Sequence, residues 1–472
     1  MEKNALNLFR KAAREIPAYK DFLKKNKFDP DSVRSFNDFG TIPTTSKKNY
    51  LRNYPLKSLC WNGTLSDKSL VFAATSGSTG DPFYFPRSSI IDNFATEYHE
   101  SFLKNANIKG STLVMDCFGM GVWIGGIITY QAFRNLADRG RNLTIITPGV
   151  NKKEIFAALE HIAPLYDNLI LCAYPPFLKD IADEAKAHGV DWKKIHVYIV
   201  CAAESFSEKF RDYIIRKMGI KNPVTDIMNI YGTADNGVMG TETPLTVAIR
   251  RSIVPNSKVY KTLFAQADRV PTFAQYDPNK IHYESINHDI FFTADNALPF
   301  IRYEIGDYGG LLTFEEVKNI LAEHGINMGD IITKANIERT VTDWPFIYVY
   351  DRIDLATKLY GAIIYPEHVK EGIAHDSLED LVTGKFTMST KNDRSQNEYL
   401  EINVELRPHV EMNETLELKI AERISEVLLL RNAEHRNNFG VMQNKVSPRV
   451  KLWEHEHPKY FKPGIKQKWV RN

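Results

Sequence analysis

The sequence has few cysteines and none in a spacing that would support a disulfide framework or a metal site. Its 472 residues include four, which are Cys60, Cys117, Cys172 and Cys201. Because they lie far apart and form no CxxC pair, we expect buried free thiols in a reducing compartment. A zinc site has little support, since His455 and His457 have no cysteine nearby.

The chain also lacks a strong charge bias and a long apolar run. Lysine and arginine number 60 and aspartate and glutamate 58, so the net charge of +2 favours neither nucleic acid nor a membrane as partner. The longest largely apolar stretch, Gly121 to Phe133, contains three glycines and is too short to span a bilayer. Glu2, Lys3 and Arg10 interrupt the N-terminus, which argues against a signal peptide. We expect a cytoplasmic protein of two or three domains.

One short segment is rich in glycine and hydroxyl side chains and directly follows the apolar residues Leu70 to Ala73. It reads Ala74-Thr75-Ser76-Gly77-Ser78-Thr79-Gly80-Asp81-Pro82. A strand that ends in such a loop presents backbone N–H groups and hydroxyls to an anion, and a polyphosphate suits it best. A P-loop is disfavoured, because Asp81 stands where its lysine would be. By itself, the segment fits a solvated turn about as well as a phosphate site.

Further motifs follow this segment in order along the chain. They are Tyr231-Gly232-Thr233-Ala234-Asp235, Arg302-Tyr303-Glu304-Ile305-Gly306-Asp307, Asp351-Arg352-Ile353-Asp354, Lys358-Leu359-Tyr360-Gly361 and Pro463-Gly464-Ile465-Lys466-Gln467-Lys468. Their order resembles the acyl-adenylate-forming superfamily of acyl-CoA ligases, peptide-synthetase adenylation domains and luciferases. The opening segments Ile16-Pro17-Ala18-Tyr19-Lys20 and Ile42-Pro43-Thr44-Thr45-Ser46-Lys47-Lys48 resemble its phenylacetate–CoA ligase branch. The resemblance covers nearly the whole chain.

Apolar periodicity predicts an α/β fold. Between about residues 70 and 350, strand-like runs at 113–115, 143–146, 169–172 and 197–200 alternate with helical patterns at 153–162 and 177–188. Such alternation predicts a parallel sheet with crossover helices. Residues 5–25 have the spacing of an amphipathic helix. Another helix is expected at 314–324, within a segment of residues 310–347 where many relatives have a shorter connection and to which we assign no function.

The pattern changes after Arg352. Residues 401–406 alternate as a strand and residues 416–430 form a long amphipathic helix, which is a small α+β pattern. We therefore expect a large N-terminal, multi-sheet, adenylate-forming domain over residues 1–352 and a small mobile C-terminal domain over residues 353–472. The resemblance implies a hinge between them at Asp354.

The resemblance also implies a nucleotide site. The phosphate cradle would be Thr75, Ser76, Gly77, Ser78, Thr79 and Gly80. Asp307 would end a turn after a strand and accept both ribose hydroxyls, with Arg352 as a second ribose contact. Tyr231 would offer its face to adenine beside Gly232 and Thr233, and Glu204 would line the adenine pocket. Asp235 would ligate Mg²⁺ where relatives usually have glutamate, and its shorter side chain would bind through water. Ala234 replaces the usual threonine near the α-phosphate.

A lysine near the C-terminus is the expected catalytic group. A cation that bridges the substrate carboxylate and the α-phosphate would stabilise the transition state of adenylation. The resemblance favours Lys466 for this role, and Lys459, Lys462 and Lys468 compete with it.

The expected acyl pocket is rich in aromatic and apolar side chains. Its residues would be Phe118, Trp123, Tyr174 and Ile230, although Trp123 and Tyr174 fit a core position equally well. This composition favours an aryl or hydrophobic acid over an amino acid, because no acidic residue near Trp123 would pair with an ammonium group.

These features together predict an AMP-forming carboxylate-activating ligase that uses ATP and Mg²⁺. A small carboxylic acid would become acyl-AMP, and CoA would then displace AMP; Lys358 and Gly361 resemble positions that approach CoA in relatives. Transfer to an amine or to a carrier protein is the alternative. A nucleotide-binding protein without catalysis is a third hypothesis, which Ala234 and Asp235 favour. The sequence leaves a monomer or a homodimer open.

Overall fold

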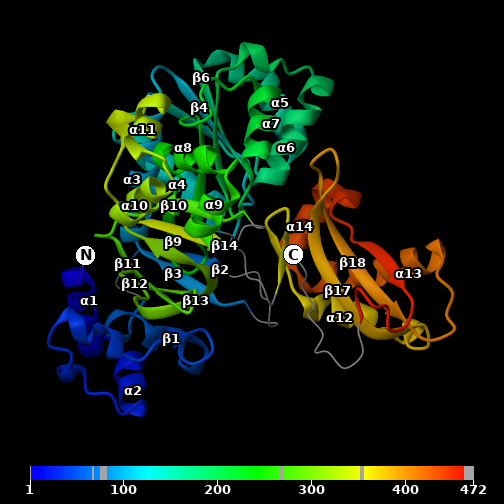
Figure 1. The fold of residues 1–472 in the computed structure, drawn as a ribbon, viewed down its shortest axis with the longest axis horizontal. Helices are drawn as coiled ribbons and strands as arrows, with labels where there is room; N and C mark the ends of the chain where they lie inside the picture. The colour runs from blue at the N-terminus through cyan, green and yellow to red at the C-terminus, as the bar shows by residue number, and fades with distance from the viewer. Residues whose placement is uncertain are drawn as a thin grey trace.

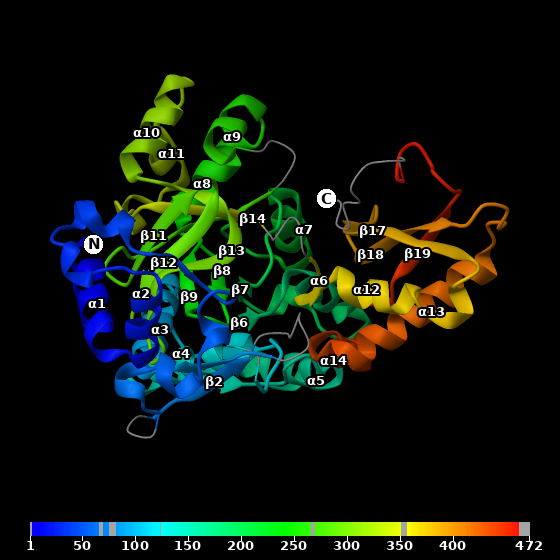
Figure 2. The same ribbon diagram turned by 90° about the horizontal axis from the view of Figure 1, so that it is seen from below.

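The structure is a computed structural model of the 472-residue chain and describes residues 2–65, 69–74, 82–122, 124–265, 270–350 and 356–461. A large body, blue to yellow-green in Figure 1, is built around one long sheet. A smaller unit, residues 356–461, lies beside it in both views (Figures 1 and 2). This arrangement confirms the predicted α/β fold with a smaller C-terminal α+β unit.

The parallel half of the long sheet confirms the four predicted strands. Its members are β4 (Thr112–Asp116), β5 (Leu143–Ile146), β6 (Asn168–Cys172), β7 (Val197–Ala202) and β8 (Ile227–Thr233). They pair in the order β5-β4-β6-β7-β8. The connecting helices are α4 (Ile124–Asp138), α5 (Lys152–His161), α6 (Pro175–Glu184) and α7 (Glu208–Met218). Crossover helices thus bring the carboxyl ends of these strands to one edge.

The rest of the long sheet is antiparallel, except that the two-residue strand β1 (Thr45–Ser46) pairs parallel with β13 (Phe300–Leu312), so the expectation of a parallel sheet as far as residue 350 is wrong. Its strands are β9 (Gly237–Thr241), β10 (Thr272–Gln275), β11 (Ile281–Ile286), β12 (Asp289–Ala294), β13 (Phe300–Leu312) and β14 (Phe346–Tyr350). Neighbouring strands here pair antiparallel. Asn287 and His288 join β11 to β12 with positive φ angles, the tight hairpin that only antiparallel strands allow.

The N-terminal segment forms two helices, where the spacing of residues 5–25 predicted one. These are α1 (Glu2–Glu15) and α2 (Pro17–Lys25). Pro17 starts the second helix because it has no N–H to continue the first. The strands β1 (Thr45–Ser46), β2 (Val71–Ala74) and β3 (Tyr84–Arg87) and the helix α3 (Ser89–Asn105) follow.

The remaining helices of the large body flank its antiparallel half. They are α8 (Pro244–Ile253), α9 (Ser257–Phe264), α10 (Phe314–Glu323) and α11 (Met328–Ala335). The helix α10 confirms the prediction at 314–324. Figure 2 shows α9, α10 and α11 together at one margin of the body.

The smaller unit has its own sheet and helices. These are the hairpin β15 (Thr357–Leu359) and β16 (Ala362–Ile364), the sheet β17 (Val382–Asn392), β18 (Glu398–Leu406) and β19 (Arg449–Trp453), and the helices α12 (Pro366–Ile373), α13 (Glu414–Arg431) and α14 (Ala433–Met442). The predicted strand and helix are confirmed in β18 and α13. The expected boundary at residues 352–353 lies outside the described residues.

The structure also bears on two features of the sequence, the cysteines and the apolar segments. All four cysteines are buried free thiols. Across the described ranges, we find no helix with the length and apolar character needed to cross a membrane.

Candidate active site

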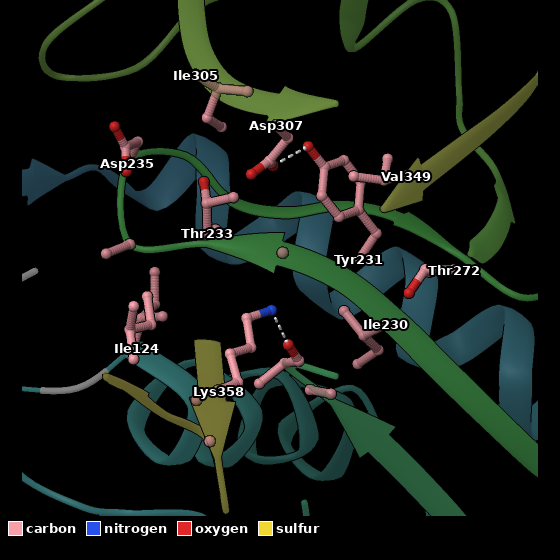
Figure 3. A pocket seen from close by; sticks show the side chains of 18 of the residues that line it. Ile124, Ile230, Tyr231, Thr233, Asp235, Thr272, Ile305, Asp307, Val349 and Lys358 are labelled. Carbon is pink, nitrogen blue, oxygen red and sulfur yellow. Dashed lines mark hydrogen bonds between the residues drawn. The ribbon is translucent and has the colours of Figure 1, made fainter. Parts of the chain in front are cut away.

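A pocket of about 250 Å³ lies where the carboxyl ends of β6, β7 and β8 face the smaller unit (Figure 3). Parallel strands commonly present ligand sites at this edge, because the loops that follow them converge there. From the smaller unit, the pocket is lined by Lys358, Gly361, Ile363, Tyr365 and Glu434, among others. Seven of the expected site residues line it, which are Tyr174, Ile230, Tyr231, Gly232, Thr233, Asp235 and Asp307.

One end of the pocket holds Asp307 and Tyr231. The Tyr231 hydroxyl donates a hydrogen bond of 2.8 Å to Asp307 Oδ2 (Figure 3). Asp307 lies inside β13 and not at the end of a turn, so that expectation is wrong. Gly306 has a φ of +85° and the pairing with β12 shifts register there, which bends the strand toward the pocket. This bend brings two distant motifs together in one hydrogen-bonded pair.

Asp235 lies between a hydroxyl and a cation. Tyr303 donates to Asp235 Oδ1 at 2.7 Å, and Lys47 Nζ lies 3.2 Å from the same oxygen. The carboxylate is 4% exposed, whereas Lys47 is 28% exposed and lines the pocket. No group of three metal-ligating side chains occurs within the described ranges. One carboxylate still fits Mg²⁺, which often takes one or two protein ligands and completes its shell with phosphate and water.

Lys47 is a site residue that sequence reasoning left without a role. Its segment, residues 42–48, was singled out because it resembles the opening of one branch of the superfamily, but nothing in the spacing showed which side chain it meets. The structure brings Lys47 to Asp235 across 188 residues of sequence.

The apolar wall of the pocket includes two of the predicted acyl-pocket residues. Tyr174 and Ile230 line it with Ile124, Ile128 and Val238. Phe118 is fully buried and packs behind Tyr174, with ring centroids 5.0 Å apart, and is not part of the lining. Apolar surface of this kind favours a hydrophobic ligand group.

Glu204 joins the large body to the smaller unit. Its backbone carbonyl accepts a hydrogen bond of 3.0 Å from Asn229 Nδ2. Its carboxylate accepts one from the Gly361 N–H, and Lys358 Nζ donates to the adjacent carbonyl of Ala203. Glu204 is buried and is not part of the pocket lining. Its predicted place beside adenine stays a prediction.

Glu434 lines the pocket from the first turn of α14 and was missed at the sequence level. Burial raises the pKa of this carboxyl to about 8; the charge of Glu204 raises it further, and Lys358 opposes them. The local sequence gives no signal for a site, because an acid after an asparagine cap is a common helix start.

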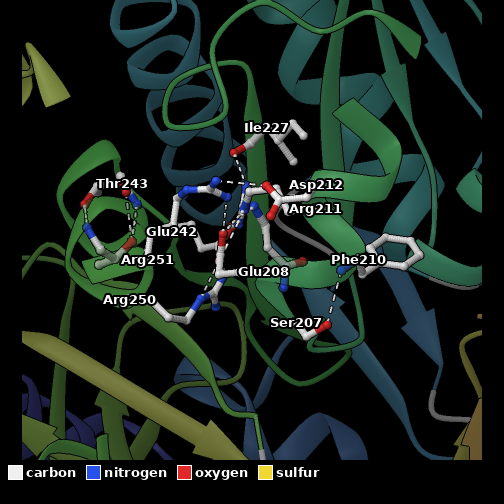
Figure 4. Close-up of polar contacts among 12 residues, drawn as sticks. Ser207, Glu208, Phe210, Arg211, Asp212, Ile227, Glu242, Thr243, Arg250 and Arg251 are labelled. Atoms are coloured by element: carbon white, nitrogen blue, oxygen red, sulfur yellow. Dashed lines mark hydrogen bonds and ion pairs between the residues drawn. The ribbon is translucent and has the colours of Figure 1, made fainter. Parts of the chain in front are cut away.

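A cluster of buried charges lies behind β8; we call Glu208, Arg211, Glu242 and Arg250 the ionic cluster (Figure 4). Arg211 Nη2 lies 2.7 Å from Glu242 Oε2, and Arg250 Nη2 lies 2.6 Å from Glu208 Oε1. Although burial opposes this, the charges of Arg211 and Arg250 hold the pKa of Glu208 at about 2. The Asn229 N–H donates to Glu242 at 3.1 Å, so the cluster holds β8 just before Ile230 and Tyr231.

Several expected site residues lie outside the described residues. They are Thr75, Ser76, Gly77, Ser78, Thr79, Gly80, Trp123, Arg352, Asp354 and Lys466, together with the competing lysines Lys462 and Lys468. Lys459 is described and does not line the pocket.

Comparison with known proteins supports the fold and the family resemblance. No protein-family model matches the chain. A phenylacetate-coenzyme A ligase of Aromatoleum evansii is 24% identical over 233 residues, 49% of each chain, so the match spans about half the length of that relative. A crystal structure of 2-hydroxyisobutyryl-CoA ligase with 2-HIB-AMP and CoA in the thioesterification state gives a TM-score of 0.67 at 14% identity. It covers 100% of this chain and 88% of the ligase.

The same ligase in its postadenylation state, in complex with R3-HIB-AMP, gives a TM-score of 0.56 with the same coverage and identity. The chain therefore shares the fold of this solved CoA ligase, and its sequence resembles that of the phenylacetate-coenzyme A ligase, as the motifs predicted.

Proposed function

We propose that this protein is an AMP-forming carboxylate-activating ligase. A carboxylic acid and ATP would give acyl-AMP and pyrophosphate, and the acyl group would then pass to the thiol of CoA. The observation that carries this proposal is the convergence of Tyr231, Asp235 and Asp307 on one pocket at the carboxyl ends of the parallel strands. Tyr231 and Asp235 belong to one motif of the resemblance and Asp307 to another, and the fold brings the two motifs together.

In the activation step, each residue would act on a different part of ATP. The Asp307 carboxylate would accept the ribose hydroxyls, and its bond from Tyr231 fixes its orientation in advance. Asp235 would hold Mg²⁺, which neutralises phosphate charge when bound. The segment 75–80 would cradle phosphates, with Arg352 at the ribose and Lys466 between the two reacting anions. The acting domains would be residues 1–352 and 353–472, with the hinge at Asp354.

In the transfer step, the smaller unit would complete the site. Its residues Lys358 and Gly361 contact the loop that follows β7, next to the pocket. The solved CoA ligase has a TM-score of 0.67 in its thioesterification state and 0.56 in its postadenylation state. This difference supports the proposal that the two parts stand here in the arrangement for acyl transfer.

The proposed acid is aryl or otherwise hydrophobic. Tyr174, Ile230 and the neighbouring isoleucines form the apolar wall, and the curated relative is a phenylacetate ligase. The acceptor is proposed to be CoA because the solved ligase binds CoA.

Pyrophosphate release tests the proposal. The protein is incubated with ATP, Mg²⁺ and a panel of acids that starts with phenylacetate, first without and then with CoA. Acid-dependent pyrophosphate release supports activation, and mass spectrometry then identifies the acceptor among CoA, amines and carrier proteins. Absence of acid-dependent release with every acid would favour a nucleotide-binding protein without catalysis.

A further inference from the structure

The carboxyl of Glu434 lines the pocket without a hydrogen-bond or ion-pair partner among the described residues. The other acids near the pocket differ. Asp235 contacts Lys47 and Tyr303, Asp307 accepts from Tyr231, and Glu204 accepts from Gly361. A carboxyl that is poorly solvated and lacks a partner is available for a ligand's proton.

The position of Glu434 is fixed by amide side chains on either side of it. Asn432 accepts the His435 N–H at 2.9 Å and donates to the carbonyl of Ile363 at 2.9 Å. Asn438 donates to the carbonyl of Tyr360, also at 2.9 Å. These bonds tie the start of α14 to the hairpin β15–β16, whose turn contacts Glu204. The carboxyl is therefore held where the smaller unit meets the pocket.

Two charged groups influence the charge of Glu434, and a neutral tyrosine also faces it. Glu204, after β7, disfavours a second negative charge, and Lys358 on β15 favours it. Tyr174, at the start of α6, is neutral because burial raises its pKa. With its pKa at about 8, the carboxyl of Glu434 can both accept and release a proton near neutral pH. A base works best when its pKa lies near the working pH and near that of a thiol, about 8.5.

Glu434 lines the pocket from the smaller unit, and this location points to the second step. The charge of Lys358 acts on Glu434, and Figure 3 shows Lys358 across the pocket from Asp307. An acyl adenylate held by Asp307 and Tyr231 would present its carbonyl between the two sides, and the acceptor would approach from the side of the smaller unit.

We propose that Glu434 is the general base of acyl transfer, which removes the proton of the acceptor thiol or amine. This inference rests on the proposed ligase function. The lone pair of the nucleophile forms the bond to the acyl carbon, and the bond from that carbon to the AMP oxygen breaks. AMP leaves with that electron pair, and the S–H or N–H proton passes to a carboxylate oxygen of Glu434.

The test supplies purified phenylacetyl adenylate, so transfer is measured apart from activation. Glu434→Gln should slow single-turnover transfer to CoA about 10²-fold at pH 7, the lower range for loss of a general base. The deficit should shrink toward pH 10, because the thiol then ionises in solution. Glu434→Asp should recover part of the rate. Pyrophosphate release with phenylacetate should fall by a much smaller factor than transfer does, and Glu422→Gln, an exposed acid on α13, should match the natural protein.

A deficit that is the same at every pH would overturn the proposal, because a misplaced side chain does not become dispensable when the thiol ionises. An equal loss of pyrophosphate release would also overturn it. Benzylamine replaces CoA in a parallel arm, and a pH-dependent deficit with either acceptor supports the role of Glu434. The natural protein could transfer the supplied adenylate but release no pyrophosphate with any acid. That result would overturn the proposed activation step and leave the role of Glu434 in transfer supported.

Discussion

Two pairs of glutamates in this protein have opposite electrostatic surroundings. Glu208 and Glu242, in the ionic cluster, lie against Arg211 and Arg250, and the pKa of Glu208 falls to about 2. Glu204 and Glu434 lie where the two parts of the molecule meet, and the pKa of Glu434 rises to about 8. Burial acts in the same direction in both places, so the counter-ions decide the difference.

The difference separates a structural use of acids from a chemical one. A carboxylate that is paired with arginines stays ionised. Glu242 in this cluster also accepts the N–H of Asn229, which holds the strand that carries Tyr231 in place. The carboxyl of Glu434, which forms no ion pair among the described residues, keeps a proton that it can exchange. The two pairs are linked, because Asn229 also donates to the backbone of Glu204.

Breaking the ionic cluster should have the largest effect. Arg250→Met leaves Glu208 and Glu242 with one buried arginine fewer, and we expect a loss of about 3–5 kcal/mol of unfolding free energy. Denaturant unfolding measures it. The matched control is Arg134→Met, which removes an exposed pair with Asp138 and should cost less than about 1 kcal/mol. Equal effects of the two variants would contradict the structural role of the cluster.

Asp235 combines features of both pairs of glutamates. It contacts a cation, Lys47, and it also lines the pocket. Asp235→Asn should lower acid-dependent pyrophosphate release about 10²-fold, the scale of one charge-stabilising group. Asp235→Glu should keep activity, since it keeps the carboxylate that Mg²⁺ needs. The measurement is the release rate over a range of Mg²⁺ concentrations. Full activity of the asparagine variant would remove the metal role and favour a nucleotide-binding protein without catalysis.

Asp307 accepts a hydrogen bond from the neutral hydroxyl of Tyr231. Asp307→Asn should weaken ATP binding by about 1.5–3 kcal/mol, because ribose hydroxyls lose a charged acceptor. Tyr231→Phe removes the hydroxyl that orients the carboxylate and should cost about 0.5–1.5 kcal/mol. Calorimetry with ATP decides both. Unchanged affinity in a folded Asp307→Asn protein would make this residue structural.

The last prediction concerns the pH dependence of stability. The pKa of Glu208 lies below its ordinary value of 4.5, so its stabilising contribution is present above pH 4.5 and is lost as the pH falls toward 2. The pKa of Glu434 lies above 4.5, so its contribution is present below pH 4.5 and is lost as the pH rises through about 8.

Thermal unfolding from pH 3 to 9 compares the two acids. Relative to the natural protein, Glu434→Gln should gain stability as the pH rises from 5 to 9. The deficit of Glu208→Gln should be largest near neutral pH and should shrink below pH 4.5. Parallel curves for the two variants would contradict the difference between the pairs.

Much of this fold could be predicted from the sequence where local signals suffice. The apolar runs that became β4, β5, β6 and β7 fixed the parallel half, because buried strands read as continuous apolar segments. The antiparallel half was missed, because Asn287 and His288 are a weak hairpin signal without glycine. The bend that places Asp307 inside β13 depends on pairing with β12, which is not local.

The residues of the candidate site likewise fall into those that local motifs predict and those that they do not. Tyr231, Asp235 and Asp307 belong to motifs with a fixed order, so the resemblance found them. Lys47 and Glu434 reach the pocket only through tertiary contacts, from positions far apart in the sequence. Their roles depend on which groups surround them, and the sequence alone does not specify those groups.

The central claim is that this pocket activates a carboxylic acid as an adenylate and then transfers it. The most direct measurement is quantitative mass spectrometry of all products after incubation with ATP, Mg²⁺, CoA and the acid that gives the fastest pyrophosphate release. We predict AMP, pyrophosphate and acyl-CoA in equal amounts, and acyl-AMP bound to the protein when CoA is left out. ADP and phosphate as the nucleotide products, or AMP whose formation does not depend on the acid, would contradict the account.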